Sequence, residues 1–197
     1  MSTAITSVAL DPPRPSAPAP ILATMFLIAG DLMFFAGLIF AFWVLRLAAP
    51  VWPPPLQPRL PIGVTTANTF VLLASSAAML AATRTLARGR GEMLTRRLGL
   101  AALLGGFFVT LQGYEWARLV GFGLTVSSGI YGALFYTLVG AHALHVAAAL
   151  VWVAVTAIRA RRGRLDHTRV AEAHACALYW HFVVALWPLL YVSVYLV

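Results

Sequence analysis

Five long apolar stretches dominate this sequence and constrain its fold more than any other feature. They cover, approximately, residues 21–47, 64–86, 98–119, 129–158 and 173–197. Each is longer than the stretch of about 20 residues that a helix needs to cross a bilayer. Only 10% of the residues are charged, against about 25% in soluble domains. Because backbone groups in hydrocarbon must be hydrogen-bonded within the chain, such stretches form helices. The sequence therefore predicts an all-α integral membrane protein, a bundle of five transmembrane helices.

The rest of the chain indicates one membrane domain preceded by a tail. Residues 1–20 are rich in proline and lack the basic start, short apolar core and cleavage site of a signal peptide, so we expect a flexible tail there. Residues 21–197 then form a single membrane domain. The chain has one cysteine, Cys176, which cannot form an internal disulfide.

The loops between the stretches differ in arginine content, and arginine supplies all 14 basic residues. The second and fourth loops hold ten arginines together, whereas the first and third hold only Arg46, Arg59 and Arg118. Since cytoplasmic loops carry the excess of basic residues, we expect a cytoplasmic N-terminus and a C-terminus outside. A net charge of +8 would suggest nucleic acid in a soluble protein. Between membrane spans it predicts membrane lipids as partners instead, and no nucleic acid.

Ionisable side chains within the spans fall at matching depths. At a rise of about 1.5 Å per residue, Asp31, His142, His145 and His181 all lie near the middle of the membrane. An ionisable group in hydrocarbon normally faces the bundle interior and pairs with another group. Asp31 is then either a proton-handling carboxylate paired with a histidine or a protonated acid that links helices. The sequence leaves both interpretations open, and we expect Asp31 to hydrogen-bond a histidine of the fourth or fifth helix.

A second polar layer is expected nearer the outer face. Asn68 lies near the start of the second span, and Gln112 and Glu115 lie near the end of the third. These side chains are expected to cap or brace helices rather than to catalyse a reaction. The tryptophans are expected in an interfacial belt or in packing. Pro188 in the fifth span cannot donate to the carbonyl of Val184, so a kink or a replacement donor is expected there.

A metal site is not expected, although two histidines share a helix face. His142 and His145 are three residues apart, a spacing that brings side chains together on a helix. A metal site also needs further ligands and a second shell, and only His181 and Asp31 lie at the same depth. We interpret the histidines as packing residues and expect neither metal nor cofactor in this chain. Nucleophilic triads and glycine-rich phosphate loops are absent from the sequence as well, a pattern typical of an accessory subunit without catalytic residues.

Several separated motifs resemble one family in their order along the chain. The resemblance is to subunit III of the haem-copper oxidases, which oxidise cytochrome c or quinol, and it runs from about residue 22 to the C-terminus. The length looks like the five-helix form of that family. The motifs that carry the resemblance are Asp31 to Gly37, Trp52 to Pro55, Asn68-Thr69 with Ser75-Ser76, Gln112 to Trp116, Phe135-Tyr136, Gly140 to Val146 and Tyr179 to Val183.

The resemblance implies a subunit without haem or copper that lies against catalytic subunit I, in one complex with subunit II. Such a complex reduces O2 to water and pumps protons across the bacterial inner membrane. This subunit would sustain proton uptake and stability of subunit I, and bind phospholipid between its helices. Asp31 matches the family's membrane-embedded glutamate, and His145 and His181 match its helix-facing histidines. The residues expected to contact lipid or partner subunits are Trp52, Trp116, Tyr179, Trp180 and Glu172, the last matching an acidic residue before the final helix.

Two departures from the family pattern keep alternatives open. The usual Ser-Glu pair is Gly30-Asp31 here, one methylene shorter, and the aspartate that commonly follows Trp-His-Phe-Val is Val184. Some relatives of this subunit accompany nitric oxide reductases, which gives a second hypothesis. The third is a proton-coupled transporter that uses Asp31 and the histidines as a relay, although the sequence shows no internal repeat of the kind common in transporters.

Overall fold

The computed structural model describes residues 18–55, 57–86, 91–163 and 167–196. Five α-helices and a terminal π-helical segment make up most of these ranges. Each of the five helices contains a stretch long and apolar enough to cross a membrane, which confirms the predicted fold class. The elements are α1 (Ala19–Ala48), α2 (Ile62–Leu86), α3 (Gly91–Gly121), α4 (Ile130–Arg161), α5 (His167–Tyr191) and η1 (Val192–Leu196).

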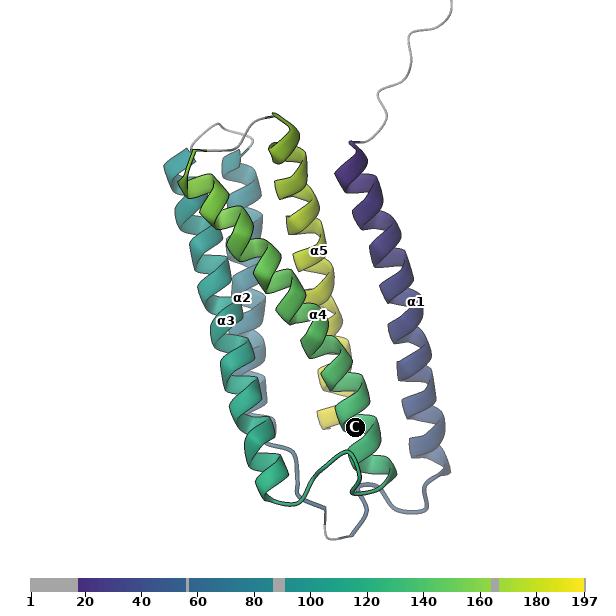
Figure 1. Cartoon of the computed structure of the whole chain (residues 1–197). Coiled ribbons are helices and arrows are strands. Elements are labelled where there is room, and N and C mark those ends of the chain that lie inside the picture. Colours follow the sequence, from purple (N-terminus) through teal and green to yellow (C-terminus); the bar gives the residue numbers. More distant parts are fainter. Residues whose placement is uncertain (1–17, 56, 87–90, 164–166, 197) are drawn as a thin grey trace, which may run out of the picture.

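The helix α5 lies at the centre of the bundle. It packs against α4, α2 and α1, while α3 packs mainly on α2 and α4. Figure 1 shows the five helices side by side, with α1 at one edge. In the apolar stretch of α5, 61% of the residues are buried, against 11% for α1. The core is therefore built around α5, and α1 is covered on one side only.

Two helices begin well before their apolar stretches. The third helix was expected from about residue 98 but begins at Gly91, because hydropathy alone leaves out Arg96 and Arg97. The guanidinium group of Arg97 donates to the carbonyl oxygen of Ala81 at 2.6 Å and also to the hydroxyl of Thr85. These bonds fasten the start of α3 to the end of α2. The fifth helix likewise begins at His167 rather than at about residue 173.

The first helix takes up the end of the predicted tail. It begins at Ala19 and has Pro20 in its first turn, a position that proline tolerates because the backbone N–H there has no partner within the helix. The expected tail of residues 1–20 is thus helical at its last two positions, and residues 1–17 lie outside the described residues.

Pro188 lies inside α5 and is followed by a change of helix type. The chain is α-helical to Tyr191 and π-helical from Val192 to Leu196. Short π-helical turns re-route backbone hydrogen bonds within a helix. The guanidinium group of Arg46, at the end of α1, donates to the carbonyl oxygen of Ser193 at 3.4 Å, which ties this segment to the edge helix.

The contact between α3 and α5 depends on one glycine. Trp180 and Trp187 of α5 are 0% and 1% exposed, so both serve packing rather than an interfacial belt. A Cβ atom at Gly105 would lie 2.5 Å from Cη2 of Trp180 and 3.3 Å from Cδ1 of Leu150. Contacts under about 3 Å between carbon atoms are strongly repulsive, since their optimal separation is about 3.5–4.0 Å. Only glycine therefore lets the indole ring lie against α3 at this point.

We expect Gly105→Ala to lower the free energy of unfolding by about 1–3 kcal/mol, because the added methyl group must displace Trp180 in a packed core. Gly106→Ala is the matched control, since a Cβ atom there meets nothing within 4 Å. Thermal unfolding of both variants in mild detergent measures the difference. Equal melting temperatures would contradict the close approach.

Candidate functional site

Three helices bring a carboxylate, an imidazole and a phenol together at mid-bundle. Nε2 of His145, on α4, lies 3.5 Å from Oδ1 of Asp31, on α1. The hydroxyl of Tyr179, on α5, donates to Oδ2 of Asp31 at 2.9 Å. The side chains of Asp31 and His145 are only 13% and 23% exposed. Asp31 and a histidine of the fourth helix are thus within ion-pair distance, while the hydrogen bond to the carboxylate comes from Tyr179.

The local sequence of α1 positions this cluster. Phe34 and Phe35 follow Asp31 by three and four residues, a spacing that places all three on one helix face. Both rings contact His145: Phe34 stacks on it with centroids 6.1 Å apart, and Phe35 meets it edge-on at 5.1 Å. The imidazole is therefore held between aromatic side chains beside the carboxylate.

The carbonyl oxygen of Ala141 fixes the proton of one ring nitrogen of His145. Nδ1 lies 2.7 Å from this oxygen, and since a carbonyl can only accept, Nδ1 carries a proton. Nε2, the other ring nitrogen, faces Oδ1 of Asp31 at 3.5 Å. Both sequence interpretations of Asp31 remain compatible with this geometry.

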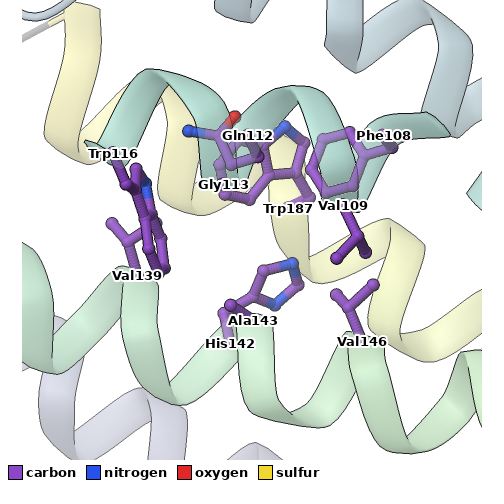
Figure 2. Close-up of a pocket in the computed structure, with 10 residues that line it drawn as sticks. All are labelled: Phe108, Val109, Gln112, Gly113, Trp116, Val139, His142, Ala143, Val146 and Trp187. Atoms are coloured by element: carbon purple, nitrogen blue, oxygen red, sulfur yellow. The ribbon is translucent and has the colours of Figure 1, made fainter. Parts of the chain in front are cut away.

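The other two histidines predicted at this depth do not join the cluster. Nδ1 of His181 lies 2.6 Å from the hydroxyl oxygen of Ser76, so this histidine links α5 to α2. His142 is 1% exposed, and neither of its ring nitrogens has a hydrogen-bond partner among the described residues. Its ring stacks on Trp187 with centroids 5.2 Å apart, and Figure 2 shows it pointing between α3 and α4. The midplane layer is thus three separate groups.

The second polar layer is a set of separate links. Nδ2 of Asn68 donates to the carbonyl oxygen of Phe108 at 3.0 Å, joining α2 to α3. Nε2 of Gln112 donates to the hydroxyl of Tyr195 at 3.1 Å, joining α3 to η1. Glu115 pairs with Arg118 of its own helix at 3.2 Å. Asn68 and Gln112 therefore brace neighbouring helices, whereas Glu115 makes a local ion pair.

The residues expected to contact lipid or partner subunits have different surroundings. Trp52 lies edge-on to Tyr131 at 5.0 Å, with the guanidinium carbon of Arg46 6.0 Å from its ring. Trp116 packs edge-on against residues 135 and 136 of α4. Glu172 is paired with Arg159 at 3.0 Å, with both side chains nearly half exposed. Trp180 is fully buried within the chain, and so lies in the core rather than on a surface.

The sequence did not predict two of the hydrogen-bond partners in the midplane layer, because the prediction considered only ionisable side chains. Tyr179 was assigned to the surface, and Ser76 was noted only as part of a motif. Their hydroxyl groups are the partners of Asp31 and His181.

Within residues 18–55, 57–86, 91–163 and 167–196, no three His, Cys, Asp or Glu side chains gather closely enough to hold a metal ion.

We expect the Asp31–Tyr179 hydrogen bond to appear as a coupling energy in a double-mutant cycle. Asp31→Asn and Tyr179→Phe, singly and together, should show non-additive losses of unfolding free energy of about 0.5–2 kcal/mol. Unfolding of the chain in mixed micelles of mild detergent and dodecyl sulfate provides the measurement. Tyr136→Phe is the control, because Tyr136 donates to the backbone of Leu124 at 2.8 Å. The hydrogen bond between Asp31 and Tyr179 would be contradicted if the coupling energy between these two residues were no larger than that between Asp31 and Tyr136.

Comparison with known proteins identifies the family to which these features belong. The family model described as Cytochrome c oxidase subunit III matches residues 21–197. A probable cytochrome c oxidase subunit 3 of Nocardia farcinica is 35% identical over 178 residues, which cover 89% of this chain and 87% of the relative. Another of Mycobacterium leprae is 32% identical over 198 residues, covering 100% of this chain and 96% of the relative.

Longer relatives match over the same region. The cytochrome c oxidase subunit 3 of Oryctolagus cuniculus is 34% identical over 174 residues, which cover 85% of this chain and 66% of the relative. The match of the family model extends over nearly the whole of all five helices. This chain therefore belongs to the cytochrome c oxidase subunit III family.

Proposed function

We propose that this chain is the accessory subunit III of a respiratory haem-copper oxidase in a bacterial inner membrane. The observation that carries the proposal is the family match over residues 21–197. It is supported by bacterial relatives of similar length that bear the subunit 3 name. In this proposal the complex reduces O2 to water and pumps protons, with its haem and copper in partner subunits. The chain binds subunit I directly and shares the complex with subunit II.

Polar contacts within the chain orient three of the histidines, as expected of structural residues in an accessory subunit. His145 is engaged by Asp31 and by its own helix, and His181 by Ser76. The imidazole of His174 is bonded to the carbonyl oxygen of Val170 at 2.9 Å.

The Asp31–His145 pair supports a role in sustaining proton uptake by subunit I. A carboxylic acid and an imidazole that lie in contact can pass a proton between them with little rearrangement. Both side chains keep some exposure, 13% and 23%, so the pair lies at the margin of the chain, where a partner subunit or lipid can cover it.

A cavity beside the first interhelical loop supports the proposed binding of phospholipid. Its volume is about 420 Å³, and its lining combines Trp52, Gln57 and Arg59 with Tyr131 and Tyr195. Aromatic rings that carry polar groups are typical of the level of lipid headgroups, and a guanidinium group pairs readily with phosphate. The cavity thus offers a headgroup site at the end of the bundle that we propose faces outward.

We expect the N-terminus to be cytoplasmic, so that the loop between α3 and α4 faces outward and the loop after α4 faces the cytoplasm. The chain's single cysteine, Cys176, is buried, so exposed positions can be converted singly. A membrane-impermeant maleimide added to intact spheroplasts should label Ser127→Cys, and label Arg162→Cys only after permeabilisation. The reverse pattern would overturn the orientation.

The proposed function is tested by isolating the tagged chain from native membranes in mild detergent. We expect copurification of oxidase subunits I and II and a reduced-minus-oxidised haem spectrum. A catalytic subunit of the nitric oxide reductase type in their place would select that complex instead. A colourless chain without partners, which transports protons with a solute after reconstitution, would contradict the accessory role.

A further inference from the structure

A small cavity lies between α3 and α4 and is closed on one side by α5. Its volume is about 100 Å³. The walls are formed mainly by Phe108, Val109, Val139, Val146 and Trp187, and Figure 2 shows these side chains around a central gap. None of the residues that line it is charged. A charged ligand would therefore lose its hydration without compensation.

His142 makes this cavity different from an ordinary packing defect. The imidazole points into it (Figure 2) and is 1% exposed. Neither ring nitrogen has a hydrogen-bond partner among the residues that the structure describes. Its contacts are aromatic: the face of the ring lies on Trp187, and the ring meets Phe35 at a steep angle. A neutral imidazole has one N–H donor and one acceptor nitrogen, and leaving buried polar groups unpaired is costly.

The cavity can be reached from the side of the helix pair. Gly113 lines it and is exposed, and Ala143 lines it from α4 and is half-buried. A Cβ atom at Gly113 would meet nothing within 4 Å. The seam between α3 and α4 at this level is therefore lined by small residues on both helices, and this is the side on which the cavity is nearest the surrounding membrane.

We propose that this cavity binds a neutral hydroxyl group, that of water or of a short-chain alcohol, through His142. A hydroxyl can donate to the bare ring nitrogen or accept from the ring N–H, which an acyl chain cannot do. The cavity volume of about 100 Å³ is well above the about 10–15 Å³ that a single water molecule requires, and it also suits a small alcohol. The apolar walls contact the carbon atoms of such an alcohol.

The test uses the full-length chain, labelled with ¹³C and ¹⁵N at histidine and reconstituted in lipid bilayers. Magic-angle-spinning NMR spectra in which magnetisation starts on water report which imidazoles contact it, and the His142 signals are assigned from their loss in His142→Leu. We expect transfer from water to the His142 nitrogens. In a second sample, ¹³C-labelled propan-1-ol is added. If His142 then receives magnetisation from the alcohol in place of water, an alcohol is identified as an occupant of the cavity.

Two internal comparisons make the outcome decisive. His174 is only half-buried near the start of α5, so transfer from water to His174 shows that the experiment works. Transfer to His174 with none to His142 from either water or alcohol would overturn the proposal. Gly113→Leu fills the cavity from its rim and should abolish transfer to His142. Gly106→Leu is the matched control, because residue 106 lies two turns earlier on the same face of α3 and does not line the cavity. Transfer that persists in Gly113→Leu would place the hydroxyl elsewhere and overturn this site.

Discussion

A polar side chain inside an apolar bundle must find its partner within the chain, because hydrocarbon offers no hydrogen bonds. Among the residues that the structure describes, most hydrogen bonds between side chains of different helices involve α5 or its continuation η1. The side chains there are bonded to three different helices, so the last segment of the chain joins α1, α2 and α3 into one unit. The links are Tyr179 to Asp31, His181 to Ser76, Trp187 to Thr69 and Tyr195 to Gln112.

The central position of α5 also explains why one glycine matters so much. The indole rings of Trp180 and Trp187 fill the space between α5 and its neighbours, and Trp187 reaches Thr69 of α2 with its N–H at 2.8 Å. A bundle with bulky aromatic groups at its centre needs small residues opposite them. Gly105 on α3 fills that role for Trp180, so the indole ring can lie directly against the backbone of α3.

The level of each polar residue along the bundle could be predicted from the sequence, whereas the direction in which its side chain points around the helix could not. The rise per residue places Asp31, His145 and His181 at one level, and the first two do meet. His181 turns toward Ser76, and His142 turns into the cavity beside α3, because the rotation of each helix is decided by packing between aromatic groups far apart in sequence. Tyr179 was assigned to a lipid or subunit contact rather than to the polar layer, since a phenol carries no charge that would single it out in an apolar span. Hydropathy likewise placed the start of α3 too late. A hydropathy scale counts Arg97 as polar and takes no account of the hydrogen bonds that its guanidinium group makes to α2.

The modest burial of α1 makes the bundle uneven in strength. This helix is held to the others by a few aromatic contacts and by two polar anchors, Asp31 at its middle and Arg46 at its end. Segments with few buried contacts open locally at a lower free energy than the rest of a protein. Local opening of this chain is therefore expected to start with α1 swinging away from α5. Such an opening separates Asp31 from both His145 and Tyr179 while α2, α3, α4 and α5 stay together. When a lipid or subunit that covers this edge of the bundle leaves or is exchanged, the carboxylate of Asp31 is therefore the first polar group to lose its partners.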